Sequence, residues 1–280
     1  GVDWGLRSNV VNPVVILAAG TSSRMKMIEG VGEVVANEVR SRPKAMLRVG
    51  PGAVPFLELL LKRIKEEGSN CVILVVGEND NVTREYFDAN PVLGVDIRYV
   101  VQTIPTNRTN PLGTAQAVQL ALSKNKDLQG HSVVVCNGDN MPPEGSFEEI
   151  FEVDCAMLAY DSAKLGMPDD RVSAFAVVRV ANDGSLEEII EKPDPKLIPE
   201  FVQADGVLRV SMNTFKMPYS EFTKAVADCP MSERNELELP IALGIWNTNN
   251  PGSMKAIPFA GEFLDLTHPS DFEFVLNKLQ

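Results

Sequence analysis

The sequence has few of the residues on which many catalytic and metal sites depend. It contains only two histidines, His131 and His268, whose separation does not make a metal-binding pair. Its four cysteines form no C-x-x-C motif, and no Ser-His-Asp order competes for the chemistry. These absences exclude zinc-finger signatures and serine-hydrolase triads. Three of the cysteines lie in or beside apolar runs, so we expect buried thiols in a reducing, cytoplasmic setting.

Long apolar runs and clusters of basic residues are also missing. No stretch reaches the roughly 18 apolar residues that a membrane span needs, and the start has no signal-peptide pattern, so we expect no membrane association. With 26 Lys and Arg against 38 Asp and Glu, the net charge is -12, which argues against a nucleic-acid partner. Any anionic ligand must therefore be held by a few well-placed cations and backbone N–H groups.

Apolar runs alternate with amphipathic runs through the first half of the chain. We expect strands at 14–18, 71–76, 97–101 and 132–136, and helices at 56–65, 82–89 and 114–123. This alternation is typical of βαβ units, whose strands are buried on both faces. Right-handed crossovers place such strands in one mainly parallel sheet.

After Asp139 the pattern becomes α+β. Asn182-Asp183-Gly184 is a strong turn signal and predicts a hairpin between 174–181 and 186–191. We further expect a strand at 207–215, helices at 220–227 and 236–246, a short strand at 256–259 and a last helix from about 270. Since no linker or repeat interrupts the chain, we expect one domain over 1–280 with halves at about 10–145 and 146–280.

Small residues and two cations follow the first expected strand. The stretch LAAGTSSRM at 17–25 places its loop at the carboxyl edge of the sheet, where α/β proteins bind ligands. Small residues let backbone N–H groups face a phosphate chain, and Arg24 adds a fork of donors. Lys44, in an R-P-K sequence, is a second charge that suits phosphate. Taken singly, the turn is equally well explained as a tight connection, and Lys44 is better explained as an exposed lysine before a strand.

Together these residues resemble the start of the sugar-phosphate nucleotidyltransferase family, which includes glucose-1-phosphate thymidylyl- and uridylyltransferases. That family begins approximately L-A-A-G-x-G-x-R-M, followed by P-K. The resemblance implies a Rossmann-like, mixed, mainly parallel sheet flanked by helices, of the GT-A-like type. It also implies that the first half binds nucleotide and the α+β half binds the sugar phosphate. Arg24 and Lys44 would bind the triphosphate and the departing pyrophosphate, and residues 27–41 between them resemble an insertion.

Gln102 and the PLGTAQA segment at 111–117 form a second part of the resemblance. A side-chain amide offers a donor and an acceptor to the edge of a base, and Gly113 permits close backbone approach. In the family the equivalent Gln and Gly contact the nucleobase; a polar residue that merely ends a strand is the alternative for Gln102. The nucleotide contacts we expect are Leu17, Ala19, Gly20, Thr21, Ser22, Gln102, Gly113 and Thr114.

Asp139, at the end of a buried strand, is the first candidate metal ligand, because Mg²⁺ prefers carboxylate oxygen. A strand-end aspartate is as often a simple cap. The family has a metal-binding Asp at this place. Asp265 resembles its partner in the metal site, although Leu266 and His268 depart from the family pattern. We expect Asp271 in the first turn of the last helix, interacting with its dipole.

The Glu191-Lys192-Pro193 sequence resembles the family's E-K-P, in which Lys binds the sugar phosphate and Glu approaches the sugar. With Gly138, these two side chains are the sugar-phosphate contacts that we expect. A lysine before proline is otherwise a common strand terminator. Glu236-Leu237-Glu238-Leu239 resembles the family's E-L-E-I but lacks the Thr-Asp that follows, so we leave this segment outside the catalytic set.

The resemblance implies an Mg²⁺-dependent enzyme that joins a nucleoside triphosphate to a sugar 1-phosphate, giving an NDP-sugar and pyrophosphate. Arg24, Lys44, Asp139 and Lys192 would be its catalytic residues. Two alternatives remain: a cytidylyltransferase acting on a small phospho-alcohol, and a catalytically silent homologue that binds a sugar nucleotide. The sequence leaves open the base, the sugar and the oligomeric state, a homo-oligomer included.

Overall fold

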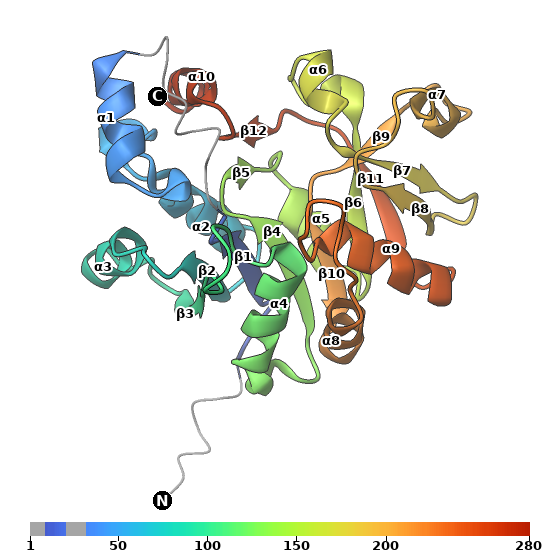
Figure 1. Cartoon of the computed structure of the whole chain (residues 1–280), viewed down its shortest axis with the longest axis horizontal. Helices are drawn as coiled ribbons and strands as arrows, with labels where there is room; N and C mark the ends of the chain where they lie inside the picture. The colour runs from blue at the N-terminus through green and yellow to red at the C-terminus, as the bar shows by residue number, and fades with distance from the viewer. Residues whose placement is uncertain (1–8, 21–31) are drawn as a thin grey trace, which may run out of the picture.

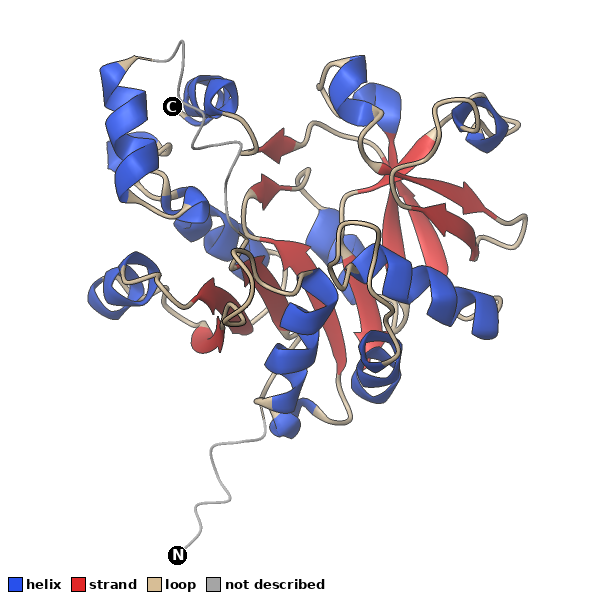
Figure 2. Cartoon of the chain, viewed as in Figure 1, coloured by secondary structure: helices blue, strands red, loops and turns tan. Residues whose placement is uncertain are grey.

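A central sheet runs through the molecule and carries helices on both faces (Figure 1, Figure 2). The computed structural model describes residues 9–20 and 32–280. The strand order is β3-β2-β1-β4-β10-β6-β9-β7-β8, and β11 pairs with β6. This arrangement confirms the predicted α/β class with a mixed sheet between helices. In the described part of the chain, no helix combines the length and apolar character required to cross a bilayer.

The first half contains the parallel strands that the sequence predicts. They are β1 (Val14–Ala18), β2 (Cys71–Gly77), β3 (Asp96–Gln102) and β4 (Ser132–Asn137). The connecting helices are α2 (Phe56–Glu66), α3 (Val82–Ala89) and α4 (Thr114–Ser123), and α1 (Glu33–Ser41) precedes them. Continuous Val and Ile runs form these strands because both faces of each strand are buried.

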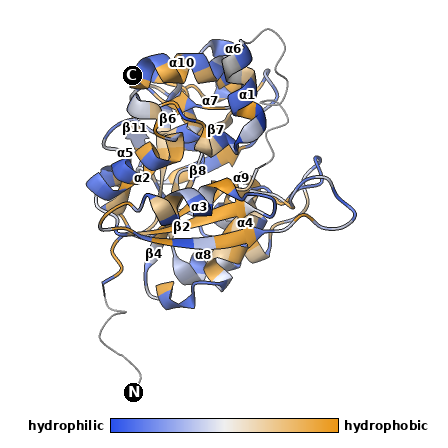
Figure 3. Ribbon diagram, turned by 90° about the vertical axis from the view of Figure 1, so that its left-hand side faces the viewer, coloured by the Kyte–Doolittle hydropathy of each residue, from blue (hydrophilic) through white to orange (hydrophobic). Residues whose placement is uncertain are grey.

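Side chains alternate between the two faces of β1 and so divide the core. Val14 and Ile16 pack in a cluster with the apolar side chains of α2, α5 and α10, whereas Val15 packs with those of α4, α8 and α9. Figure 3 shows hydrophobic colour concentrated in the strands and in α4, and much hydrophilic colour on the outer helices. Because both faces of the sheet are covered, a ligand reaches it at the ends of the strands rather than on a face.

The second half is α+β, as expected, and is joined to the first through antiparallel pairing. Its elements are α5 (Ser146–Phe151), β6 (Ala156–Asp161), α6 (Asp169–Val172), β7 (Ala176–Val180), β8 (Leu186–Ile190), α7 (Ile198–Phe201), β9 (Arg209–Ser211), β10 (Phe215–Pro218), α8 (Tyr219–Ala227), α9 (Leu239–Asn249), β11 (Lys255–Phe259) and α10 (Pro269–Leu279). β7 and β8 form the predicted hairpin. β10 pairs with β4 on one side and β6 on the other, so one strand links the halves.

Two of the expected elements are wrong. The single strand expected at 207–215 is divided into β9 and β10, because Asn213 between them has a φ of 61° and turns the chain. The helix expected from 236 begins at Leu239 instead. Glu238, its N-cap, is extended, and Pro240 occupies the first turn, where a missing N–H costs no helical hydrogen bond.

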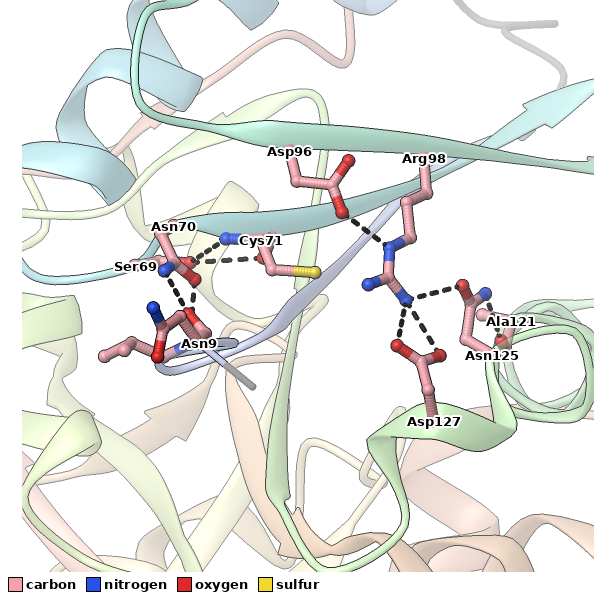
Figure 4. A network of polar contacts seen from close by, with 10 residues as sticks. Asn9, Ser69, Asn70, Cys71, Asp96, Arg98, Ala121, Asn125 and Asp127 are labelled. Carbon is pink, nitrogen blue, oxygen red and sulfur yellow. Dashed lines mark hydrogen bonds and ion pairs between the residues drawn. The ribbon is translucent and has the colours of Figure 1, made fainter. Parts of the chain in front are cut away.

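A network of polar contacts lies near the amino-terminal ends of the strands. Arg98 on β3 donates to Asp127 at 2.9 Å and to Asn125 at 3.2 Å, and it also pairs with Asp96 (Figure 4). Asn125 in turn donates to the carbonyl of Ala121 at the end of α4. This network satisfies the Arg98 charge by connecting β3 to the turn after α4.

Candidate active site at the carboxyl edge of the sheet

A pocket of about 450 Å³ opens where β1, β2 and β4 end. The chain passes from β1 to β2 on one side and returns to β4 on the other, so this is the point where the strand order reverses. Ligands of open α/β sheets bind at such points. The residues lining the pocket include Ala18, Ala19, Gly20, Arg40, Arg42, Lys44, Gly77, Glu78, Asn79, Ile104, Thr114, Asn137, Asp139 and Asn213.

Four of the expected nucleotide contacts line this pocket. They are Leu17, Ala19, Gly20 and Thr114. Three further predictions, Thr21, Ser22 and Arg24, fall outside the described residues. The first part of the expected insertion does too, and its remainder contributes α1, whose Arg40 reaches the pocket.

Lys44 and Asp139 form an ion pair inside the pocket. The Lys44 Nζ lies 2.6 Å from Asp139 Oδ2, and each side chain is 20% exposed. Lys44 opens a short 3-10 helix whose next residues, Met46 included, are fully buried and anchor the segment. Asp139 follows β4 after one intervening residue, Gly138. Two residues that are 95 positions apart, as their numbers show, are thus brought together at the carboxyl edge.

Asp265 lies beside Asp139. It belongs to β12 (Leu264–Asp265), which pairs antiparallel with β5 (Asn140–Met141), and the Leu266 N–H donates to the Asp139 carbonyl at 2.9 Å. Both aspartates line a recess of about 180 Å³ that adjoins the main pocket and shares Asn137, Asp139 and Asn213 with it. The structure therefore gathers the two candidate metal ligands, although they are distant in sequence.

The Asp265 carboxylate is held by several donors but remains hard to ionise. Asn140 Nδ2 donates to its Oδ1 at 2.6 Å, and Arg171 and Thr267 both contact its Oδ2. Burial and the charge of Asp139 nevertheless raise the pKa of Asp265 to about 6, against the lowering effects of Thr267 and Arg171. Two neighbouring carboxylates of this kind favour a nearby positive charge.

The donor set of this site fits a divalent ion that is shared with a phosphate ligand. Within residues 9–20 and 32–280, no three His, Cys, Asp or Glu side chains gather in a way that could hold a metal. Mg²⁺, however, is commonly bound by one or two carboxylates together with water and substrate phosphates. Asp139 lines both the main pocket and the recess, and Asp265 lines the recess. Together they supply that pair of hard oxygen ligands. Their role as metal ligands stays a prediction.

Glu191 joins this recess to a third cavity, a groove of about 600 Å³ between β8 and α9. Burial raises the pKa of Glu191, while the charges of Arg234 and Lys192 act in the opposite direction. Lys192 has a left-handed φ of 46° and lines the groove. Of the expected sugar-phosphate contacts, Glu191 therefore lines the recess with Asp139 and Asp265, whereas Lys192 lines only the groove.

Gly138 has a packing role at this edge. A Cβ there would lie 3.2 Å from the side chains of Ile16 and Ala18 and from the carbonyl of Leu17, which also accepts the Gly138 N–H. Gly138 lines neither the pocket nor the recess. It lets the turn before Asp139 pass close to β1, so its predicted contact with the sugar phosphate stays untested.

Gln102 and Gly113, two further expected nucleotide contacts, do not line the pocket, although Pro111 and Thr114 beside Gly113 do. Gln102 is 3% exposed, and its Nε2 donates to the Gly113 carbonyl at 3.0 Å and to Gln116. Gly113 has a φ of 119°, and a Cβ there would lie 2.6 Å from the Leu237 carbonyl oxygen. That carbonyl accepts the Ala115 N–H at 2.8 Å. The extended segment at 236–238 is therefore paired with the turn that starts α4.

Sequence reasoning missed several residues of the site. Arg171 on α6 contacts Asp265 across 94 positions, and no local pattern marks it. Asn213 lines both the pocket and the recess, and Arg234 lines the groove, where it pairs with Glu238. A left-handed Asn213 between two strands was the one available signal, because asparagine tolerates that conformation better than most residues.

Comparison with known proteins gives a consistent result. A family model described as Nucleotidyl transferase matches residues 14–207, which is more than half of the chain. The chain is 28% identical over 161 residues to D-glycero-alpha-D-manno-heptose 1-phosphate guanylyltransferase of Campylobacter jejuni, covering 58% of each protein. It is 27% identical over 183 residues to the low-salt glycan biosynthesis nucleotidyltransferase Agl11 of Haloferax volcanii, covering 64% of this chain and 44% of that protein.

These matches span about half the length of both curated relatives. Among solved structures, UTP-bound UGPase from Acinetobacter baumannii superposes with a TM-score of 0.69 at 17% identity, covering 96% of this chain and 93% of that one. A likeness at this identity shows a shared fold, with helices around a mixed central sheet.

Proposed function

The chain belongs to the nucleotidyl transferase family, and from this premise we propose that it joins a nucleoside triphosphate to a sugar 1-phosphate and releases pyrophosphate. The observation that carries the proposal is the Lys44–Asp139 ion pair in the pocket at the strand-order reversal, with Asp265 beside it. Cation and carboxylates at one edge match the needs of a reaction between two phosphate compounds.

Both reactants carry negative charge, so positioning and electrostatic stabilisation dominate the reaction. The acceptor phosphate oxygen attacks the α-phosphorus in line with the departing pyrophosphate. Lys44 moves from Asp139 to the phosphate chain and stabilises charge on the leaving group, and Arg24 adds to it. A phosphate dianion is already a nucleophile, so the reaction requires no general base.

Asp139 and Asp265 would hold Mg²⁺, which would supply positive charge to offset the repulsion between the phosphates and these two carboxylates. Asn140, which donates to Asp265 at 2.6 Å, keeps that carboxylate next to Asp139. The backbone bond between Leu266 and the Asp139 carbonyl keeps their two segments in register.

The recess and the groove accept the second substrate. Glu191 lines both, so its carboxylate can accept hydrogen bonds from sugar hydroxyls, while Lys192 and Arg234 line the groove as cations for a phosphate. The E-K-P resemblance favours a sugar 1-phosphate over a phospho-alcohol. We also propose that residues 1–280 form one catalytic domain, because β10 is paired with both β4 and β6.

A substrate screen tests this function. The protein, with Mg²⁺, is incubated with each of GTP, UTP, dTTP, CTP and ATP against a panel of sugar 1-phosphates and phosphocholine, and pyrophosphate release is recorded. We expect release to require both a triphosphate and a sugar 1-phosphate. Release with CTP and phosphocholine alone would identify a cytidylyltransferase instead, and nucleotide binding without any release would identify a silent homologue.

A further inference from the structure

Arg171 connects three segments around the candidate metal site. It lies on α6, and its guanidinium contacts Asp265 on β12 through Nη2 and Asp271 in the first turn of α10 through Nη1, the latter at 2.8 Å. Its side chain is 20% exposed. A forked guanidinium can hold two carboxylates at once, which a lysine does less well.

The partners of Asp265 leave little room for another ligand. Its Oδ1 accepts from Asn140, and its Oδ2 is contacted by both Arg171 and Thr267. An ionised carboxylate has about four acceptor positions, and three of them are used here. A divalent cation that takes Oδ2 of Asp265 as a ligand must displace one of the two donors there, and Arg171 is the one whose charge competes directly with it.

Asp139, like Asp265, forms an ion pair with a basic side chain. Lys44 lies 2.6 Å from its Oδ2, so each candidate metal ligand is matched by one basic side chain. We propose that Arg171 is a positioning residue that holds Asp265 as a counter-ion and gives up Oδ2 to the divalent metal when the nucleotide binds. This inference rests on the proposed function, since it concerns the metal site of that reaction.

Asp271 is the second partner of Arg171 and keeps its contact when the metal replaces Arg171 at Asp265. Its Oδ2 accepts the N–H groups of Thr267 and His268, at 2.9 and 2.7 Å, so it is fixed by the start of α10. Arg171 bonds to the other oxygen, Oδ1. When Arg171 leaves Asp265, its contact with Asp271 keeps the guanidinium beside the site, where it remains close to an incoming phosphate.

The replacement of Arg171 by the metal at Asp265 links metal binding to nucleotide binding. Phosphates draw Lys44 from Asp139 and favour release of Arg171 from Asp265, so the carboxylates become available together. By thermodynamic linkage, nucleotide must then raise the affinity for metal by the same factor as metal raises the affinity for nucleotide. Removing the Arg171 charge weakens this coupling, because Asp265 no longer has a cation to lose.

Binding of Mn²⁺ to the full-length protein, measured by the electron paramagnetic resonance signal of free Mn²⁺, tests the inference without turnover. Four proteins are compared without nucleotide: wild type, Arg171→Gln, Arg171→Lys and Arg179→Gln. Arg179 is a matched control, since it pairs with Glu187 and Glu188 outside the metal site. We expect Arg171→Gln to bind Mn²⁺ at least about fivefold more tightly than wild type, while the other two stay within about twofold.

Unchanged or weaker Mn²⁺ binding by a folded Arg171→Gln protein overturns the proposal. If that variant does not fold, the wild-type protein decides: the Arg171 side-chain NMR signal, assigned with Arg171→Lys, must shift when Mg²⁺ and nucleotide are added together, and an unshifted signal overturns the proposal. The proposed function fails separately, through absence of pyrophosphate release, which none of these measurements uses.

Discussion

At the scale of single residues, the site consists of charges that pair with one another in the pocket and that, in the proposed reaction, bind phosphate. Lys44 is the clearest case, because its nearest charged partner is Asp139 and its segment is anchored by buried neighbours. The position of Lys44 follows from packing, and its ion pair keeps its charge directed at the pocket.

Replacing Lys44 with Ala is expected to lower kcat/KM for pyrophosphate release by on the order of 10²-fold or more, because the leaving group loses a cation. Lys62→Ala is the control: Lys62 also forms an ion pair, with Glu58, but is 53% exposed on α2. Steady-state kinetics of both variants make the comparison. Equal rates for the two variants would refute the assignment of Lys44 to the leaving group.

The pKa of Asp265 gives a prediction for stability against pH. The folded-state value of about 6 lies above the usual value of 3.8, so the ionised carboxylate costs stability above about pH 6 and the cost disappears as pH falls toward 4. We therefore expect wild type to gain stability relative to Asp265→Asn when the pH is lowered from 7.5 to 5. Urea unfolding of both proteins at the two pH values measures this difference, and a pH-independent difference would contradict the pKa.

Part of the site was predictable from sequence because of one regularity. Residues that follow buried parallel strands meet at the carboxyl edge, so Gly20 and Asp139 could be placed there without coordinates. Arg171 could not, because its contact with Asp265 depends on how the second half folds over the edge. Gln102 was expected to contact the nucleobase, but its amide nitrogen donates to the Gly113 carbonyl, and neither residue lines the pocket.

At the scale of elements, the turn before α4 depends on the segment at 236–238. Gly113 sits against the backbone of Leu237, and Leu237 bonds to Leu112 and Ala115 on either side of it. Thr114 adds a side-chain bond to the Leu239 N–H at 2.8 Å, at the start of α9. The apolar and charged residues of this segment predict a helix, but these backbone hydrogen bonds hold it extended.

Gly113→Ala tests this packing, with Gly130→Ala as the matched control. Both glycines have a left-handed φ, 119° and 90°, but a Cβ at Gly130 meets no atom within 4 Å. Alanine at Gly130 carries a backbone cost of about 1–2 kcal/mol. At Gly113, whose φ of 119° and ψ of -177° lie in a region open almost only to glycine, the backbone cost is about 1–3 kcal/mol. We expect Gly113→Ala to lose at least about 1 kcal/mol more, because the new methyl meets backbone atoms. Chemical denaturation measures both values, and equal losses would show that the Leu237 contact is not a constraint.

Element types were largely predictable, whereas some boundaries and pairings were not. Val and Ile runs gave the parallel strands of the first half, since burial on both faces leaves that pattern. The division between β9 and β10 depends on one left-handed Asn213, and a single asparagine is a weak sequence signal. β12 and β5 have two residues each, too few for any periodic pattern.

At the scale of the whole molecule, the proposed reaction requires a protein with a net charge of -12 to bring two anions together. The overall charge opposes this, so the local arrangement of Lys44, Asp139 and Asp265 has to provide it. β10 contributes by holding the two halves in one sheet, which keeps the main pocket and the recess next to each other. Function in this fold therefore depends on a few placed charges rather than on the average surface.

The most direct test of the central claim is pyrophosphate release by Asp139→Asn, compared with Asp161→Asn under the same conditions with Mg²⁺. Both aspartates follow or end a buried strand, but Asp161 caps a turn by accepting the Ala163 N–H at 3.0 Å. We predict a loss of about 10²-fold or more for Asp139→Asn, with an unchanged circular dichroism spectrum, and a loss within a few-fold for Asp161→Asn. Near-normal release by a folded Asp139→Asn protein would contradict the account.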